Sequence, residues 1–436
     1  MHYIKERIFH MSRYHAMREV PATAGFKKGD VLFLCGELFG RGYANGIVDE
    51  AKAKGMTIIG STVGRRDSDG SLRPLNEEEL AAAEALLGGT IINIPLEAGF
   101  DMEPGSDGVS PVDRFKGVKP DDWSNVTLDQ AQVTYSKERG TERFRSNLAS
   151  VIAQLETMLP AQGNLVIVHT MAGGIPRARV FMPILNKLFK GQGDRFLSSE
   201  AFWNSDMGRL CSVSFNEVTA DTFSYLIEGT AGLRDRFAVR YAAYGYHGTE
   251  VLIDGAYTWQ SYTPYLQGWA KIRLEDIAMA AWEKGIKATV YNCPEIQTNS
   301  SALFLGVENS LYPLLASLKV EGEQSIIAEC QELLREGATL ADLLACANTY
   351  LSSKLVTSTR DFATWPQHNS PQQQEFMLNS SAELIGMNAE GKEIICAVLS
   401  RGVFRGVGKL MFDSSWDPKA PLFWLNHDVI AKRLAK

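Results

Sequence analysis

The sequence has no long hydrophobic run and no excess of positive charge. None of its apolar segments approaches the ~20 residues that span a bilayer, and residues 1–15 lack the apolar stretch of a secretory signal peptide. Lysine and arginine together number 44 against 51 aspartates and glutamates, for a net charge of -7. A nucleic-acid-binding protein would instead show a basic surface. We therefore expect a cytoplasmic protein with no membrane span and no nucleic-acid partner.

Cysteine pairs and metal-ligand patterns are also absent. The six cysteines are widely scattered and form no C-x-x-C pair. No acidic or histidine cluster has the spacing of a metal site, so no metal is implied. Cys293 is interpreted as a small buried hydrophobic residue, and His169 and His247 as hydrogen-bonded structural groups.

The 436 residues are 45% hydrophobic and 22% charged, which is enough apolar material for a large core. Six short apolar runs have the length of buried strands: 31–35, 56–63, 90–96, 164–168, 238–244 and 288–293. Helical patterns separate the first three runs: 43–54 and 75–87. Strands that alternate with helices are typical of an α/β fold with a doubly wound, Rossmann-like parallel sheet.

The chain is predicted to comprise a Rossmann-type core with insertions and a C-terminal extension. The core is a cofactor-binding and catalytic unit over 1–304 with insertions at about 99–160 and 175–235, and the mainly helical extension covers 305–436. Within the insertions, glycine, proline and serine favour surface loops at 99–140 and 190–212, and a helix is expected from residue 144.

A glycine-rich turn follows the first predicted strand. Gly36, Gly40 and Gly42 have the spacing G-x-x-x-G-x-G, with Arg41 between the last two. Glycines at a strand-to-helix turn let the backbone approach a pyrophosphate, whose charge the helix N-terminus then meets. Such a string also marks ordinary turns. Its place between a strand and a helix at the start of the fold favours a dinucleotide site.

Two arginines follow the second predicted strand. Arg65 and Arg66 stand where an enzyme that binds NAD usually has an acidic residue for the ribose 2′-hydroxyl. Guanidinium groups at that place suit a 2′-phosphate, although two solvated surface arginines would look the same. The sequence therefore predicts NADPH as cofactor, with NADH possible.

A tyrosine and a lysine lie at the start of a long helical pattern. A tyrosine placed by a lysine is a common proton donor to a reacting oxygen. Lys271 lies about two turns into this helix with its side chain directed back toward the N-terminus, so Tyr262 could meet it. Tyr265 is six residues from Lys271 and faces elsewhere. From these residues alone, a chance pairing is the default interpretation.

Several segments together resemble the enoyl-[acyl-carrier-protein] reductases of the short-chain dehydrogenase/reductase superfamily. Tyr262 and Lys271 have the Tyr-x8-Lys spacing of the large trans-2-enoyl-CoA/ACP reductases. The segment Y-G-Y-H-G is similar to the one that carries a second active-site tyrosine, which implies Tyr246. The similar segments cover about 31–97, 164–174 and 238–300.

The resemblance also implies cofactor contacts. The segment P-E-I-Q-T implies that Ile296 and Thr298 hold the nicotinamide carboxamide, and M-A-G-G implies that Ala172 and Gly173 lie beside the cofactor. Lys271 would bind the nicotinamide ribose. One departure is the sequence His-Thr-Met before this Ala-Gly-Gly, where the family usually has an asparagine.

The implied reaction is reduction of the trans-2 double bond of an enoyl thioester, carried by acyl carrier protein or CoA, in fatty-acid synthesis. A neutral tyrosine can stabilise the enolate oxygen in this reaction. One alternative is an NADP-dependent carbonyl reductase or alcohol dehydrogenase, whose tyrosine acts as phenolate and needs ~4 kcal/mol of electrostatic bias. Another is a dinucleotide-sensing regulator without turnover. Acyl chain length, carrier and oligomeric state stay unpredicted.

Overall fold

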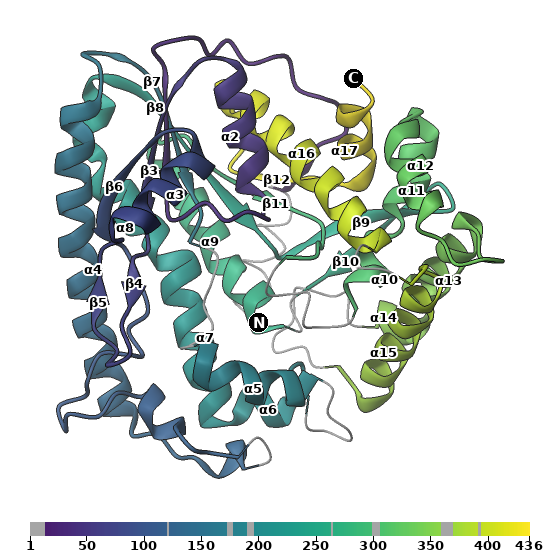
Figure 1. Cartoon of the computed structure of the whole chain (residues 1–436), viewed down its shortest axis with the longest axis horizontal. Coiled ribbons are helices and arrows are strands. Elements are labelled where there is room, and N and C mark those ends of the chain that lie inside the picture. The colour runs from purple at the N-terminus through teal and green to yellow at the C-terminus, as the bar shows by residue number, and fades with distance from the viewer. Residues whose placement is uncertain are drawn as a thin grey trace.

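A parallel sheet forms the centre of the protein (Figure 1). The structure, a computed structural model, describes residues 14–119, 122–171, 178–189, 196–262, 265–298, 306–358, 369–390 and 394–436. The sheet strands are β1 (Tyr14–Ala16), β2 (Val31–Cys35), β3 (Thr57–Thr62), β6 (Thr90–Pro95), β7 (Gly163–His169), β8 (Phe237–Gly245), β11 (Ala288–Asn292) and β12 (Leu422–Trp424). All six strand regions predicted from the sequence are among them.

The strand order is β1-β12-β11-β8-β7-β2-β3-β6, and all neighbouring strands are parallel. From β6 to β11 this is the doubly wound order of dinucleotide-binding folds, in which the winding direction reverses between β2 and β7. Ligands bind such sheets outside the carboxyl ends of the strands at this reversal. The predicted fold class, an α/β protein with a Rossmann-like parallel sheet, is confirmed.

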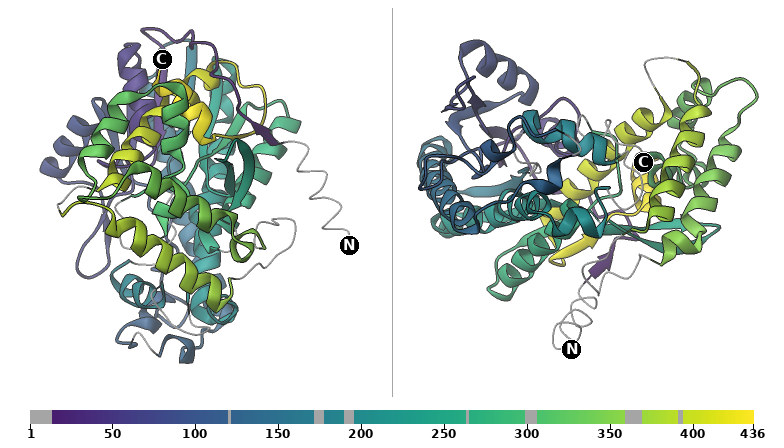
Figure 2. Two further views of the ribbon diagram at one scale, coloured as in Figure 1. Left: turned by 90° about the vertical axis from the view of Figure 1, so that its right-hand side faces the viewer. Right: turned by 90° about the horizontal axis from the view of Figure 1, so that it is seen from below.

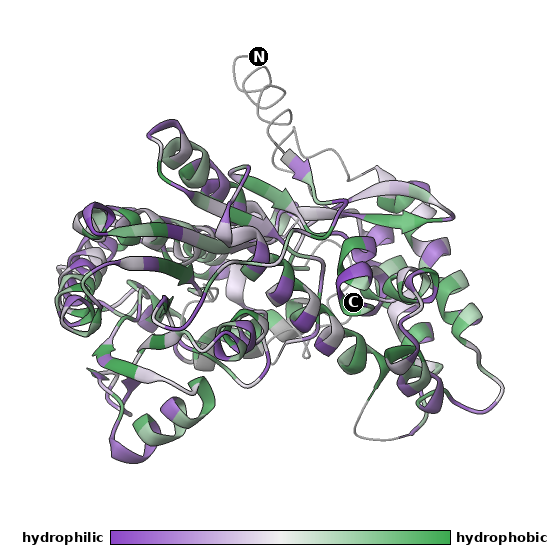
Figure 3. Ribbon diagram, turned by 90° about the horizontal axis from the view of Figure 1, so that it is seen from above, coloured by the Kyte–Doolittle hydropathy of each residue, from purple (hydrophilic) through white to green (hydrophobic). Residues whose placement is uncertain are grey.

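Helices cover both faces of the sheet. Within β2, Leu32 and Leu34 belong to one hydrophobic cluster, whereas Val31 and Phe33 belong to another. This alternation arises because successive strand residues point to opposite faces. On the first face lie α2 (Ala44–Ala53), α16 (Ile395–Trp416) and α17 (His427–Leu434); on the second lie α4 (Gln130–Met158), α8 (Thr222–Gly229) and α9 (Leu266–Glu283). The outer helices alternate between hydrophilic and hydrophobic residues (Figure 3), as surface helices do.

Apart from the helix between β3 and β6, the other helices belong to the inserted and C-terminal parts of the chain. Those before residue 217 are α3 (Glu77–Leu87), α5 (Ala178–Phe189), α6 (Glu200–Asn204) and α7 (Asp206–Asn216). The later ones are α10 (Val307–Leu311), α11 (Leu314–Glu321), α12 (Gln324–Glu332), α13 (Leu340–Ser352), α14 (Lys354–Thr357) and α15 (Pro371–Gly386). Figures 1 and 2 show α10 to α15 grouped beside the sheet, on the side away from α4.

The C-terminal part of the chain also completes the core. β12 pairs with both β1 and β11. α16 crosses α2 at close range, and glycines make this approach possible. A Cβ on Gly46 would collide with the carbonyl oxygen of Phe404, and a Cβ on Gly408 would collide with the backbone of Gly46. Strand β12 was not predicted from the sequence, since three residues carry little periodicity. The boundary at residue 304 stays a prediction.

Two segments that were predicted as loops contain helices. α4 begins at Gln130, because the Asp129 side chain accepts a hydrogen bond from the amide of Ala131. Gly140 then lets this helix pack against the backbone of Phe100. In 190–212, α6 and α7 begin after Ser199 and Ser205, whose hydroxyls cap them. Serine was therefore a helix-start signal in a segment whose composition indicated a loop.

A β-hairpin precedes α9 and was also missed. It consists of β9 (Gly248–Ile253) and β10 (Ala256–Ser261), which pair antiparallel. Asp254 and Gly255 form the two-residue turn with φ of 49° and 80°. Positive φ at both positions is what a type I′ turn requires, and Asp-Gly is its usual sequence. A second, very short hairpin pairs β4 (Arg65–Arg66) with β5 (Leu72–Arg73).

Within the described ranges, the helices include none that is both long and apolar enough to cross a membrane.

Candidate active site

The turn after β2 lies at the carboxyl edge of the sheet, next to the reversal of winding. Gly36 has φ of 124°, a conformation that favours glycine. Its amide donates to Ser61 Oγ in β3 at 2.9 Å, and a Cβ at this position would collide with Thr170 Oγ1, just after β7. Glycine is therefore needed for the carboxyl ends of three neighbouring strands to approach each other.

Open space lies beside the rest of this turn. A Cβ added to Gly40 or Gly42 would meet no heavy atom within 4 Å. Tyr43, at the start of α2, makes no capping hydrogen bond with its side chain, and the first turn of α2 contains no acidic residue. Exposed amides and a positive helix end suit an anion. The predicted cofactor residues Gly36, Gly40, Arg41 and Gly42 thus lie on a turn that fits a pyrophosphate.

The two predicted cofactor arginines are both paired with carboxylates. Arg65 donates to both oxygens of Glu37, at 2.8 and 3.0 Å, and Glu37 also accepts from Thr62 Oγ1 at 2.9 Å. Arg66 lies 2.5 Å from Glu97 Oε2. Glu37 comes from the glycine turn and is only 7% exposed. Its carboxylate thus lies beside the end of β3, the usual place of the acid that binds an adenosine ribose.

Two predicted catalytic tyrosines lie together at the carboxyl edge. The rings of Tyr246 and Tyr262 stack with centroids 4.5 Å apart and planes inclined by 11°. The Tyr246 hydroxyl donates to Glu295 Oε1 at 2.8 Å, and the Glu295 amide donates to the Tyr262 hydroxyl oxygen at 3.2 Å. The three residues follow the sheet strand β8, the hairpin strand β10 and the sheet strand β11, so only the tertiary fold brings them together.

Glycine and a buried polar cluster hold the tyrosine segment. A Cβ on Gly268 would collide with the Tyr262 carbonyl oxygen, so α9 can begin directly under this residue. The Glu275 carboxylate, also on α9, meets His247 Nδ1 at 2.9 Å and accepts from Asn292 Nδ2 at 2.7 Å. His247 in turn accepts from the Tyr262 amide through its carbonyl at 3.0 Å. This cluster ties the tyrosine segment to α9 and β11.

Burial keeps both tyrosines neutral. It raises the pKa of Tyr246 and of Tyr262, and the nearby Glu295 carboxylate raises both further. Burial also raises the pKa of Glu295 to about 7, because its hydrogen bonds with Tyr246 and Ser310 only partly offset burial and the charge of Glu308. A neutral tyrosine can donate a hydrogen bond to a developing oxyanion, whereas a phenolate base would need the opposite shift.

Lys271 lies buried on α9, close to the ends of two strands. Burial lowers its pKa to about 8, and its charge interacts with Cys293 after β11 and with His169 at the end of β7. Among the described residues, no hydrogen bond joins Lys271 to Tyr262, whose oxygen meets the Glu295 amide instead. The Tyr265 hydroxyl contacts Met377 Sδ on α15 at 3.3 Å.

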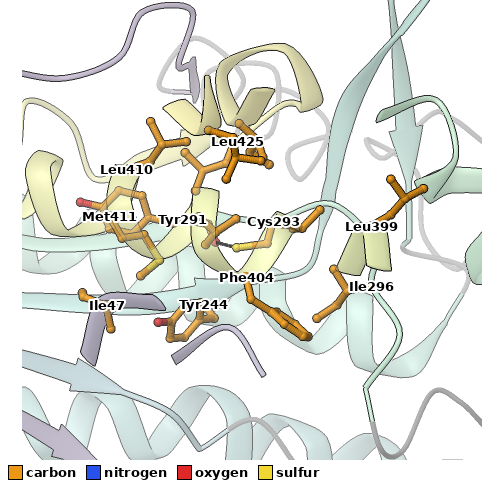
Figure 4. Packing of buried hydrophobic residues seen from close by; sticks show 14 of the residues in the cluster. Ile47, Tyr244, Tyr291, Cys293, Ile296, Leu399, Phe404, Leu410, Met411 and Leu425 are labelled. Atoms are coloured by element: carbon orange, nitrogen blue, oxygen red, sulfur yellow. Dashed lines mark hydrogen bonds between the residues drawn. The ribbon is translucent and has the colours of Figure 1, made fainter. Parts of the chain in front are cut away.

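The remaining predicted cofactor residues lie near the end of β11 or outside the described ranges. Ile296 is 5% exposed and belongs to the cluster that contains Tyr244, Cys293 and Phe404 (Figure 4). Thr298 follows two residues later and has further contacts. The predicted residues Ala172 and Gly173 lie outside the described ranges.

Three acidic residues of this region were missed from the sequence: Glu37, Glu275 and Glu295. The available signals were weak. Glu37 stands inside the glycine turn, and Glu295 stands inside the segment P-E-I-Q-T that resembles a cofactor-binding element. Glu275 lies four residues after Lys271, on the same side of the helix. In each case the partner is distant in sequence.

Comparison with known proteins assigns the family. The family described as enoyl-acyl carrier protein reductase FabMG matches residues 13–434. A solved apo structure of FabMG is 49% identical, with 96% of this chain and 98% of that chain covered and a TM-score of 0.90. A solved NADH-bound structure of FabMG is 44% identical, with the same coverage and a TM-score of 0.76. No curated protein matches. This chain therefore belongs to the FabMG family of enoyl-acyl carrier protein reductases.

Proposed function

We propose that Tyr262, Tyr246 and Lys271 carry the enoyl-acyl carrier protein reductase activity of this chain, with NADH as the hydride donor. The observation that carries the proposal is the stacked pair of neutral tyrosines, whose hydroxyls both meet Glu295 at the carboxyl edge of the sheet. Reduction of a trans-2-enoyl thioester places negative charge on the thioester oxygen. Buried hydroxyl donors stabilise such a charge strongly.

Tyr262 is proposed as the principal donor. Its oxygen accepts a hydrogen bond from the Glu295 amide, and hydrogen bonds from Thr249 and Ser310 also stabilise negative charge on it. Tyr246 would be the second donor. This division follows the Tyr-x8-Lys resemblance and fits the contacts of Tyr265, whose hydroxyl is directed to Met377.

The chain offers groups for each part of a dinucleotide. The glycine turn and the start of α2 suit the pyrophosphate, Lys271 the nicotinamide ribose, and Ile296 and Thr298 the carboxamide. The sequence resemblance also assigns Ala172 and Gly173 to the cofactor site. When bound, the reduced nicotinamide supplies the hydride for Cβ of the substrate. The protein contributes orientation and donors to the thioester oxygen.

NADH is proposed in preference to NADPH, which the sequence favoured. The FabMG relative with 44% identity was solved with NADH. Here Arg65 and Arg66 are already paired with Glu37 and Glu97. A 2′-phosphate beside the end of β3 would meet the Glu37 carboxylate, whereas a 2′-hydroxyl can donate a hydrogen bond to it. Fluorescence titration of the protein with each reduced cofactor tests this choice, and tighter binding of NADPH would reject it.

The carrier of the acyl group is proposed to be acyl carrier protein, with CoA as the alternative from the sequence. We also propose the cytoplasm, the location expected from the sequence, as the place of this reaction. A carbonyl reductase is disfavoured because burial opposes tyrosine ionisation.

The test is oxidation of NADH by the purified protein with crotonyl-ACP and crotonyl-CoA, with butyryl product identified by mass spectrometry. No turnover with either thioester would contradict the proposal, and NADH binding without any turnover would support the regulator instead.

A further inference from the structure

We propose that Glu295 is a positioning residue that switches the donor role of Tyr246. In the protonated form it leaves the Tyr246 hydrogen for the thioester oxygen; as carboxylate it takes that hydrogen for itself. This inference rests on the proposed function of Tyr246. It adds a group that neither the sequence resemblance nor the site residues derived from it include.

The Tyr246 hydroxyl has one hydrogen for two acceptors, the Glu295 carboxylate and the thioester oxygen of the substrate. A tyrosine hydroxyl carries a single O–H and can also accept. Its oxygen lies 2.8 Å from Glu295 Oε1. When Glu295 is ionised, it can only accept, so the Tyr246 hydrogen is committed to it. When Glu295 is protonated, the carboxyl can donate to the Tyr246 oxygen, and the Tyr246 hydrogen is free for substrate.

Tyr262 is not subject to the same switch. Its oxygen meets the Glu295 main-chain amide at 3.2 Å, which donates at every pH. Glu295 thus holds the two stacked tyrosines through different groups, and only the contact with Tyr246 depends on protonation. The principal donor stays available while the second donor is turned on or off.

The surroundings of Glu295 disfavour its charged form. Burial and Glu308 raise the pKa of Glu295 to about 7, so both forms are populated under neutral conditions. Titratable groups face its carboxyl from several elements: Tyr43, Tyr246, Tyr262, Tyr265, Glu308 and Cys396. Within the described part of the chain, no lysine or arginine charge contributes to holding Glu295 ionised.

The test is the pH profile of kcat/KM between about pH 6 and 9 at saturating NADH, because this quantity reports ionisations in the enzyme before it binds the enoyl thioester. We expect the wild-type value to fall as pH rises through about 7, to a plateau reduced on the order of 10- to 100-fold by the lost donor. Glu295→Gln should remove this fall, because its amide does not titrate and its NH2 group can donate to the Tyr246 oxygen. Tyr246→Phe should also be flat, at the level of the wild-type alkaline plateau.

Glu308→Gln is the matched control. This buried neighbour accepts from Ser381 Oγ at 2.6 Å, a bond that the amide oxygen can keep. The fall should persist at unchanged or lower pH, because a repelling carboxylate has been removed. A Glu308→Gln profile without the fall would assign the titration to Glu308 and overturn the proposal.

Other outcomes also decide the matter. A Glu295→Gln enzyme that keeps the wild-type fall, or that is as slow as Tyr246→Phe at pH 6, contradicts the switch. If Glu295→Gln does not fold, Tyr246→Phe decides alone, since a fall that persists without this hydroxyl rejects the inference. Absence of turnover by the wild type at every pH would instead be a failure of the proposed function.

Discussion

The glycine turn and the tyrosine pair lie at the same edge of the sheet, yet they are built in different ways. The turn takes Gly36, Gly40 and Gly42 from one short segment, and its properties come from the backbone. The pair takes Tyr246, Tyr262 and Glu295 from the ends of three strands. Binding an anion therefore needs a local conformation, whereas placing the proton donors needs the central sheet and the β9–β10 hairpin together. The two regions should fail differently when they are changed.

The largest effect is expected from Tyr262→Phe. Loss of the principal donor should lower kcat by roughly 10²–10⁴, with NADH affinity almost unchanged. Steady-state kinetics with crotonyl-ACP and a separate binding titration measure the two quantities. Tyr265→Phe is the control, because its hydroxyl contacts Met377. An active Tyr262→Phe enzyme together with an inactive Tyr265→Phe enzyme would refute the assignment.

The glycine turn should lose binding and keep its fold. In Gly40→Val, the added side chain would occupy the open space beside the turn and obstruct a pyrophosphate. We expect NADH affinity to fall at least about 100-fold, with an unchanged circular dichroism spectrum. Gly232→Val is the control, since Gly232 also has no neighbour within 4 Å and lies elsewhere. Normal titration of folded Gly40→Val would show that the cofactor binds at another place.

Lys271 should affect the stability of the protein as well as cofactor binding. Its pKa is lowered from 10.5 to about 8 in the folded protein, because burial disfavours the charged form. Below pH 8 the folded state therefore bears the cost of a buried charge, about 3 kcal/mol at 1.36 kcal/mol per pKa unit. As pH rises from 8 to 10.5, only the unfolded chain still holds the proton, so the free energy of unfolding increases.

Lys271→Met should consequently stabilise the cofactor-free protein by about this amount at pH 7, and the gain should shrink toward pH 10.5. The same variant should bind NADH more weakly, because it lacks the proposed ribose contact. Denaturant unfolding at pH 7 and pH 10 measures the first effect, and fluorescence titration the second. A variant that is destabilised equally at both pH values would contradict this account of Lys271.

The smallest expected effect is on cofactor choice. Glu37→Gln should release Arg65 from its ion pair and remove the charge that repels a 2′-phosphate. We expect NADPH to bind about 10-fold more tightly, which corresponds to ~1.4 kcal/mol, with NADH changed less. Glu97→Gln is the matched control at the other arginine. Unchanged NADPH affinity in Glu37→Gln would show that this carboxylate does not select the cofactor.

Patterns of neighbouring residues accounted for most of the sheet. A buried parallel strand needs a continuous apolar run, and 31–35 and 164–168 show it directly. The same reasoning missed β9 and β10, although Asp254-Gly255 is a hairpin signal, and it gave α4 a late start because Asp129 was not recognised as a cap. The start of α4 lies in a predicted insertion whose composition suggested a loop, whereas β9 and β10 lie in the predicted core.

What the sequence by itself determined is therefore local: the parallel α/β sheet, the glycine turn that opens it, and two tyrosines and a lysine near one helix start. What only the tertiary structure decided is how charged and polar groups distant in sequence are paired. Arg65 pairs with Glu37 of the glycine turn, and Glu295 contacts the hydroxyls of Tyr246 and Tyr262. The physical reason is that backbone conformation depends on adjacent residues, whereas the protonation and pairing of a buried side chain depend on what the fold places around it.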